Sequence, residues 1–160
     1  MTPNDVLRSI RYMLDLSDIK LVSIAQLANA ETSLDVESVK AMQKREGEAG
    51  YLPCSDRFLL DFLDGLVIYK RGRREGAPEQ PKEERVNNNL ILKKLRIAFE
   101  LKDADLMHLF DEAGFPLNKP ELSALFRQSE HRNFRACGDQ VLRNFLKGLT
   151  MVLAASGSRH

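Results

Sequence analysis

The residues of this chain that are best suited to chemistry occur in pairs, one in each half of the sequence. Cys54 and Cys137 each stand just before an expected helix, and Asp56 and Asp139 follow them by two residues. A thiol at a helix N-terminus can have a lowered pKa and act as a nucleophile. A small buried side chain that fills the turn before the helix explains the same position without reactivity. Because there is no Cys-x-x-Cys spacing, a zinc or redox motif is unsupported.

The paired aspartates, and two paired arginines, also have structural interpretations. Asp56 and Asp139 are expected to cap the helices that they precede. Arg11 and Arg96 flank the apolar stripes of their helices, where the stem of an arginine packs and its charged head reaches outward. We expect each arginine to pair with a carboxylate, and the duplicated aspartate is one candidate. The functional alternative is a pair of anion-binding arginines.

Basic residues gather in a few places: in the run that starts at Lys70, at Lys93, Lys94 and Arg96, and at Arg132 and Arg135 on either side of Phe134. Cations around an aromatic side chain bind single-stranded nucleic acid through phosphate contacts and stacking. Acidic residues are interleaved with these cations, and the formal net charge is only +1. Solvated helix faces and an exposed linker are therefore the alternative interpretation.

Three consecutive asparagines, Asn87, Asn88 and Asn89, form an unusual run. Asn87 suits a helix N-cap, and Asn89 matches Asn4 in the first half, but capping leaves the other two without an explanation. We therefore look for a binding surface here first. Its predicted members are the polar and basic residues near this run and near Phe134: Asn4, Arg8, Arg11, Asn88, Asn89, Lys93, Arg96, Phe134 and Arg135.

No motif for catalysis, a cofactor or a metal can be found. His108, His131 and His160 are scattered without metal-ligand spacing, and nucleophile-elbow, phosphate-loop, dinucleotide and zinc-protease signatures are all missing. The sequence therefore predicts no catalytic residues, no cofactor and no metal ligands. We expect a protein that is not an enzyme.

A long internal duplication organises the whole chain. The pattern Cys-x-Asp-x-x-Leu-x-x-Phe-Leu-x-Gly-Leu occurs at 54–66 and again at 137–149, and upstream matches extend the repeat toward both N-terminal ends. Apolar residues recur with helical period almost throughout, and no strand pattern competes. The fold predicted is all-α, with two tandem similar four-helix units packed with pseudo-twofold symmetry into one globule. The first repeat is expected at 1–71, a charged linker at 72–86 and the second repeat at 87–155.

Local signals set the expected helix starts. Thr2 before Pro3 and Asn87 are good N-caps for the first helix of each repeat, and second helices are expected near Asp18 and Asp103. Asn118, with Glu121 three residues later, predicts a capping box for a third helix.

Gly65 and Gly148 interrupt the fourth helix of each repeat, at a cost of about 1 kcal/mol relative to alanine. We expect them to permit close helix approach, most simply across the interface between the repeats. A ligand passing close to the backbone is the alternative.

Composition places few further limits. A chain of 160 residues buries roughly two-thirds of its unfolded surface. No apolar run approaches the ~18 residues of a membrane span, and the N-terminus lacks the form of a signal peptide. We therefore expect no membrane association, and a cytoplasmic protein whose cysteines are reduced.

With both repeats aligned, the sequence resembles the YehS-like family of small bacterial proteins. The resemblance rests on the segments 4–12, 70–72, 87–99 and 133–140, among which the run Asn-Asn-Asn-x-x-x-Lys-Lys-Leu-Arg is the most specific. It covers nearly the whole chain. It implies a duplicated domain of unknown function and no established activity, so it supplies no catalytic residues.

The resulting functional hypothesis is a small cytoplasmic binding or adaptor module whose partner is another protein or a second copy of itself. The alternative is a nucleic-acid-binding regulator that uses a basic patch around the first helix of the second repeat and the linker. An enzyme with its substrate between the repeats is a third hypothesis.

Overall fold

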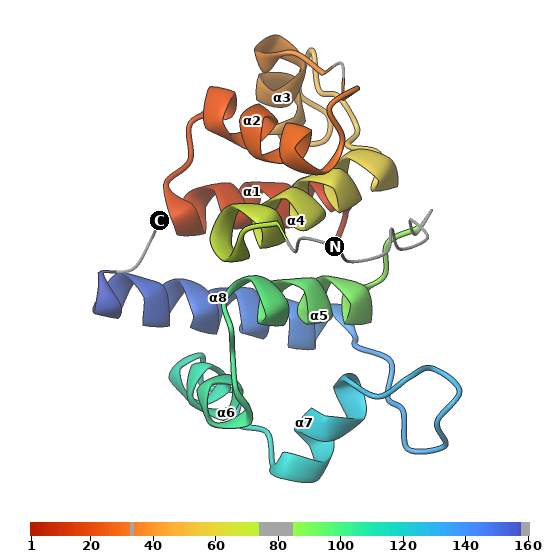
Figure 1. Ribbon diagram of the computed structural model, residues 1–160, viewed down its shortest axis with the longest axis vertical. Helices are drawn as coiled ribbons and strands as arrows, with labels where there is room; N and C mark the ends of the chain where they lie inside the picture. Colours follow the sequence, from red (N-terminus) through yellow and green to blue (C-terminus); the bar gives the residue numbers. More distant parts are fainter. Residues whose placement is uncertain (33, 74–84, 158–160) are drawn as a thin grey trace. The chain divides into compact units, whose positions relative to one another are not determined.

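The computed structural model describes residues 1–32, 34–73 and 85–157. These residues form helices and no strand, which confirms the all-α prediction. Figure 1 shows the elements in chain order: α1 (Pro3–Leu14), α2 (Asp18–Ala28), α3 (Val36–Met42), α4 (Asp56–Arg71), α5 (Asn88–Ala98), α6 (Asp103–Glu112), α7 (Lys119–Leu125) and α8 (Asp139–Ser156).

Residue contacts divide the chain into two compact units. Unit 1 consists of Met1–Tyr12 and Leu16–Val86, and unit 2 consists of Met13–Asp15 and Asn87–His160. The predicted linker, residues 72–86, falls mostly on residues 74–84, which lie outside the described residues. The pseudo-twofold packing of the units stays a prediction, and each unit is described below by itself.

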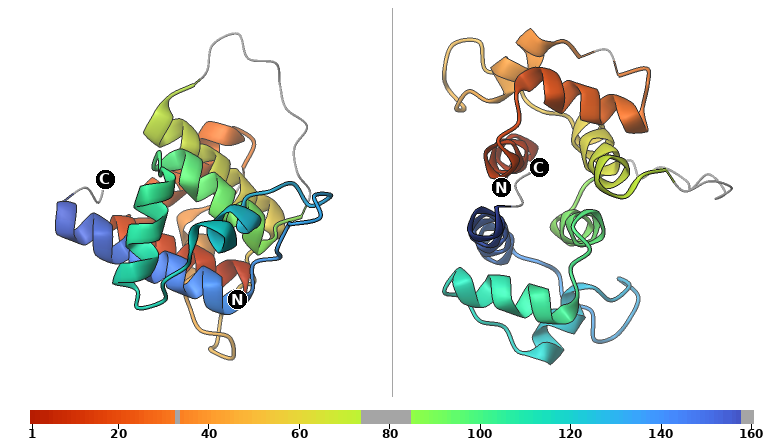
Figure 2. Two further views of the ribbon diagram at one scale, coloured as in Figure 1. Left: turned by 90° about the horizontal axis from the view of Figure 1, so that it is seen from below. Right: turned by 60° about the vertical axis from the view of Figure 1, so that its left-hand side comes forward.

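The two units share one internal plan. In unit 1, α2 packs against α3 and α4, and in unit 2, α6 packs against α7 and α8. In the right-hand view of Figure 2, α2 lies across α4 within unit 1, and α6 lies across α8 within unit 2. Helix α5 contacts α8 as well. In each unit, the third and fourth helices therefore both pack against the second helix.

Each core is built from the apolar stripes that the helical period predicts. Leu7 and Ile10 of α1 are fully buried, as are Leu92 and Leu95 at the matching positions of α5. In unit 2, Phe110 of α6 packs against Phe145 of α8, with ring centroids 5.9 Å apart. Burying such side chains is the main favourable term for folding, at roughly 1.5–3 kcal/mol each.

Local capping sets the helix starts largely as predicted. The Asn87 side chain accepts a hydrogen bond from the Leu90 nitrogen, and Asn118 forms the expected capping box with Glu121. The predicted caps at Asp56 and Asp139 are wrong, because these residues are the first helical residues of α4 and α8. The N-cap of α4 is Ser55, whose hydroxyl accepts from the Phe58 nitrogen. Gly138 is the N-cap of α8 and has no side chain to make such a bond.

Gly65 and Gly148 allow two helices to approach closely, as predicted, but the contact lies within each unit and not across the repeats. A Cβ on Gly65 of α4 would lie 1.9 Å from the Ile24 carbonyl oxygen of α2. A Cβ on Gly148 of α8 would lie 2.0 Å from the Leu109 carbonyl oxygen of α6. Each glycine is the point at which the fourth helix passes over the backbone of the second. The expected location at the repeat interface is therefore wrong.

Candidate functional site

Asn4, the first residue of the predicted binding surface, is only 2% exposed and holds three separate segments of unit 1 together. Its side-chain nitrogen donates hydrogen bonds to the carbonyl oxygens of Met42, at 3.0 Å, and Leu52, at 2.9 Å. Its side-chain oxygen accepts one from the Cys54 nitrogen at 2.8 Å. The amide thereby joins the start of α1 to the end of α3 and to the loop before α4. Asn4 is not part of an exposed surface.

Asn89 makes the same three bonds in unit 2. It donates to the carbonyl oxygens of Leu125, at 2.9 Å, and Arg135, at 3.0 Å, and it accepts from the Cys137 nitrogen at 2.9 Å. Asn4 is buried and Asn89 is half-buried, and the loss of either amide would leave its backbone partners unpaired. The repeated asparagine therefore has a structural role in both units.

The whole asparagine run now has an explanation. Asn87 caps α5, and Asn89 joins three segments of unit 2 as described above. We call Asn4 and Asn89 the asparagine hubs. Asn88 donates to the Cys137 carbonyl oxygen at 3.0 Å and to the Asp139 carboxylate at 2.9 Å. Each of the three side chains is thus bonded within unit 2. Sequence reasoning could explain only the cap, because the other two partners are distant in the chain.

Arg8 and Lys93 stand at matching positions, one turn after the asparagine hubs, but they behave differently. Arg8 donates to the carbonyl oxygens of Gln43, at 3.2 Å, and Lys44, at 3.1 Å, and pairs with Asp5 at 3.2 Å. It therefore satisfies the carbonyl groups that follow α3. The Lys93 side chain is exposed and makes no hydrogen bond or ion pair with any residue that the structure describes.

Arg11 and Arg96 each pair with a carboxylate, as predicted, but not with the aspartates of the fourth helices. The Arg11 side chain contacts Asp18 at 3.0 Å, and Arg96 contacts Asp103 at 2.9 Å. These partners are themselves equivalent, since each is the first residue of a second helix. Arg96 also lies over the Phe126 ring, 4.8 Å from its centroid. Both arginines thus tie the first helix of a repeat to its neighbours.

The two cysteines are buried free thiols. Burial, with a smaller contribution from the Asp56 charge, raises the pKa of the Cys54 thiol to about 12. Burial also raises the pKa of the Cys137 thiol to about 11, against the opposing charge of Arg135. Each sulfur donates to the carbonyl oxygen of the next residue. Thiols in such surroundings are protonated at neutral pH, which contradicts the nucleophile hypothesis.

Asp61 of α4 is a buried carboxylate that sequence reasoning missed. It is 3% exposed, and the Arg57 guanidinium pairs with one of its oxygens at 2.9 Å. Its other oxygen accepts hydrogen bonds from Asn29 at 3.0 Å and from Thr32 at 3.3 Å. Unit 2 has Asn144 at the matching position, which donates to the Gln140 carbonyl oxygen one turn earlier in its own helix. With both oxygens bonded, Asp61 acts as a structural link between α4 and the end of α2.

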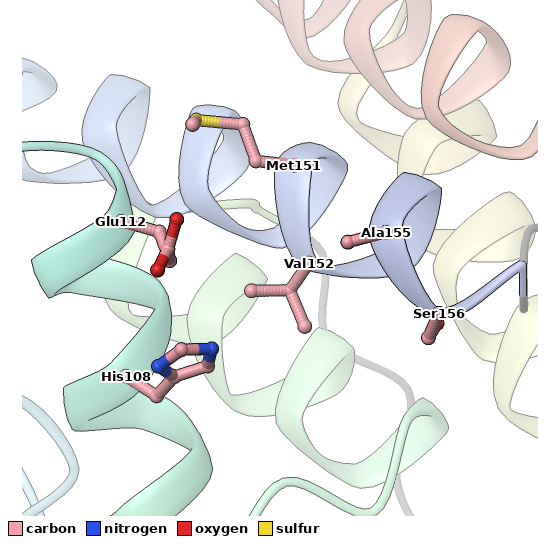
Figure 3. Close-up of a pocket in the computed structure, with 6 residues that line it drawn as sticks. All are labelled: His108, Glu112, Met151, Val152, Ala155 and Ser156. Atoms are coloured by element: carbon pink, nitrogen blue, oxygen red, sulfur yellow. The ribbon is translucent and has the colours of Figure 1, made fainter.

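A shallow pocket of about 340 Å³ lies between α6 and α8 in unit 2 (Figure 3). His108 and Glu112 of α6 form one wall, and the other wall consists of Met151, Val152, Ala155 and Ser156 of α8. In Figure 3 the imidazole and the carboxylate stand on successive turns of α6 and face the apolar Val152. Within the part of the chain that the structure describes, no three His, Cys, Asp or Glu residues are placed to hold a metal ion. Sequence reasoning noted His108 but could not foresee this hollow.

Phe134 and Arg135 lie in the loop between α7 and α8. Arg135 is exposed and approaches Glu121 at 3.8 Å, while Phe134 is only half-buried. The Arg135 nitrogen donates to the Ala124 carbonyl oxygen, which holds the loop against the end of α7. The predicted surface is therefore divided: its asparagines are bonded inside the units, and Lys93 and Arg135 remain exposed in unit 2.

Comparison with known proteins agrees with the duplication. A family described as "Protein of unknown function (DUF1456)" matches residues 3–72 and again residues 88–153. The chain is 46% identical to "Uncharacterized protein YehS" of Escherichia coli (strain K12) over 149 residues, which is 93% of this chain and 94% of that protein. No solved structure matches the chain at a significant level. None of the described helices has both the length and the apolar composition needed to cross a membrane.

Proposed function

Since the chain belongs to the DUF1456 family of proteins of unknown function and is similar to the YehS protein, we propose its role from its own residues: a non-enzymatic module that binds another protein or a second copy of itself. One observation carries this proposal. The repeated residues with the chemistry to form an active site are instead bonded inside the fold.

This use of polar residues is seen most clearly in the matching hubs. Asn4 and Asn89 each bond to three backbone groups, one of which is the backbone nitrogen of Cys54 or Cys137. The thiols of these two cysteines are buried and have a raised pKa. A catalytic group needs an accessible face and a pKa near the working pH. The pocket beside His108 is wide and shallow, whereas a typical substrate site encloses its ligand with convergent polar groups.

The surface offers large apolar side chains that suit a protein partner. Tyr12 at the end of α1 is 71% exposed, and Ile19 at the start of α2 is 70% exposed. They flank the ion pair between Arg11 and Asp18, which fixes these two helix ends beside each other. Tyrosine is enriched at the cores of protein interfaces. Burying a large apolar side chain such as Ile19 contributes about 1.5–3 kcal/mol to the free energy of association.

Sedimentation velocity over a concentration series, together with capture of partners from a lysate, tests this proposal. We expect self-association or a captured partner for the natural chain, and loss of that complex in a Tyr12→Ser, Ile19→Ser double variant. Ala104→Ser, at the unit 2 position that matches Ile19, is the control and should retain the complex. A chain that stays monomeric and captures nothing, or a complex indifferent to the double variant, would contradict the proposal.

Nucleic-acid binding, the alternative that the sequence raised, has less support. Arg8, Arg11 and Arg96, which could contact phosphates, are engaged with backbone oxygens or carboxylates, and the linker lies mostly outside the described residues. Fluorescence anisotropy with labelled RNA and DNA across a salt series tests it. Saturable binding that falls linearly on a log–log salt plot would favour this alternative.

A further inference from the structure

We propose that the exposed cations around the α7–α8 loop of unit 2 bind an acidic segment of a partner protein. The residues are Lys93, Arg127, Arg132 and Arg135, called below the unit 2 cation surface. This inference rests on the proposed protein-binding function and names the class of partner.

The bonds of Asn89 bring α5, the end of α7 and the loop before α8 together. Asn89, Lys93 and Arg96 follow one another at helical spacing, so they lie on one face of α5. Asn89 bonds to the carbonyl oxygens of Leu125 and Arg135, while Arg96 lies over the Phe126 ring. Lys93 lies between them on the same face of α5.

The loop of unit 1 makes the same three backbone hydrogen bonds, so the two loops can be compared for charge. In unit 1, the nitrogens of Glu48, Tyr51 and Leu52 donate to the carbonyl oxygens of Arg45, Glu48 and Ala41. In unit 2, the nitrogens of His131, Phe134 and Arg135 donate to those of Gln128, His131 and Ala124. The two sets of donors and acceptors occupy matching positions in the repeat. The two loops are therefore held by the same hydrogen bonds, although Gly47 and Gly50 of unit 1 have positive φ and the matching Glu130 and Asn133 of unit 2 do not.

In the unit 1 loop, charged side chains make hydrogen bonds to the backbone of the same loop. Lys44 donates to the Ala49 carbonyl oxygen at 2.9 Å, and the Glu48 carboxylate accepts from the Arg45 nitrogen at 3.1 Å. Residues 43–53 hold two basic and two acidic side chains, so this loop is neutral.

The unit 2 loop carries a net positive charge. Residues 126–136 hold three arginines against one glutamate. Arg127 and Arg132 are exposed, and they make no hydrogen bond or ion pair among the described residues. Lys93 is in the same state, where its unit 1 counterpart Arg8 is bonded to two carbonyl oxygens. The unit 2 loop thus has an excess of basic side chains, and of the four cations only Arg135 approaches a carboxylate among the described residues, that of Glu121 at 3.8 Å.

The chemistry of this surface favours carboxylates over nucleic acid. Three of its four cations are arginines, whose planar guanidinium groups match carboxylate geometry with two parallel hydrogen bonds. Single-stranded nucleic acid also requires open aromatic faces on which bases stack. Phe126 is already covered by Arg96, and Phe134 is half-buried in the loop. An acidic protein segment therefore fits better than a nucleic-acid strand.

The test measures anisotropy of a labelled peptide of alternating Glu and Ser, titrated with the full chain at low salt. Single-stranded RNA of the same charge is titrated in parallel. We expect saturable peptide binding that weakens about tenfold or more in an Arg127→Glu, Arg132→Glu variant, because two attractive charges become repulsive. The matched control is Lys44→Glu, Arg45→Glu in the loop of unit 1, which should bind as the natural chain does. Thermal melts followed by circular dichroism verify that both variants fold.

Three results would overturn the inference: no peptide binding at low salt, equal weakening by the two variants, or binding of the RNA in clear preference to the peptide. The last would instead assign the surface to nucleic acid. None of them decides the proposed function itself, since the Tyr12 and Ile19 variant tests an apolar surface by sedimentation. A chain can therefore fail the peptide test and still associate with a protein.

Discussion

The side-chain oxygen of Asn4 accepts a hydrogen bond of 2.8 Å from the backbone nitrogen of Cys54, 50 residues further along the chain. In unit 2, Asn89 and Cys137 repeat this bond at 2.9 Å. One short polar side chain near the start of each repeat thus positions the residue before the N-cap of its last helix. The most visible repeated residues of the sequence, the cysteine and the asparagine, are two ends of one structural contact.

Replacing either hub asparagine by alanine should destabilise the chain strongly. Asn4→Ala removes three hydrogen bonds and leaves the Met42 and Leu52 carbonyl oxygens and the Cys54 nitrogen without a protein partner. We expect a loss of about 2–3 kcal/mol in the free energy of unfolding, measured by urea denaturation. Asn133→Ala, at an exposed position in the unit 2 loop, is the control and should change little. A loss no larger than that of the control would show that water replaces the hub.

Adding a methyl group to the glycines at the helix crossings should be more damaging. In Gly65→Ala the new Cβ would meet the Ile24 carbonyl oxygen, and in Gly148→Ala that of Leu109, and neither backbone group can turn aside as a side chain can. Separation of the crossing helices should cost about 3 kcal/mol or more. Gly138→Ala adds the same atom where no heavy atom lies within 4 Å. Chemical denaturation of the three variants checks this, and equal midpoints would refute the close approach.

The elements could be predicted from the sequence because their signals are local. Asn118 and Glu121 form a capping box within one turn of the chain, and the apolar stripes follow the helical period. The need for small residues at 65 and 148 was also visible, because glycine is costly within a helix. The helix that packs against each glycine could not be predicted, because the apolar periodicity of a helix does not indicate which other helix crosses it.

Tertiary partners explain the remaining differences. Arg11 pairs with a carboxylate, as expected. Its partner is Asp18, which the turn between α1 and α2 places beside it. The bonds of Asn89 span 36 to 48 residues, and no sequence pattern of one chain encodes them. The pocket beside His108 depends on how α6 and α8 cross, so it was equally invisible.

Asp61 provides a test of how far the two units have diverged. Asp61→Ala leaves the Arg57 guanidinium, the Asn29 amide and the Thr32 hydroxyl without their shared acceptor. We expect a loss of about 2–4 kcal/mol in the free energy of unfolding, because the remaining groups are only partly exposed. Asn144→Ala removes the matching residue of unit 2, whose single bond lies within its own helix, and should cost less than about 1 kcal/mol. Hydrogen exchange should localise the first effect to α2 and α4. Similar losses for both variants would show that Asp61 has no special structural role.

The thiols should be unreactive in the folded chain at neutral pH. A pKa raised from 9.0 to about 11 for Cys137, and to about 12 for Cys54, lowers the thiolate fraction by about a hundredfold or more, and burial also restricts access. Labelling with a chromogenic disulfide should therefore be slow for the native chain and rapid in denaturant. Native labelling as fast as that of the unfolded chain would contradict the buried, protonated state.

The same pKa values predict an alkaline loss of stability. Because folding favours the protonated thiols, their contribution is fully present below the unfolded pKa near 9 and is lost as pH rises through the folded values of about 11 and 12. A Cys54→Ala, Cys137→Ala variant keeps small side chains at both positions but has no thiol to ionise. The free energy of unfolding of the natural chain should thus fall faster than that of the variant above about pH 9, where lysine and tyrosine titration affects both chains equally. Parallel pH profiles for the two chains would mean that the thiols ionise as readily in the folded state as in the unfolded state.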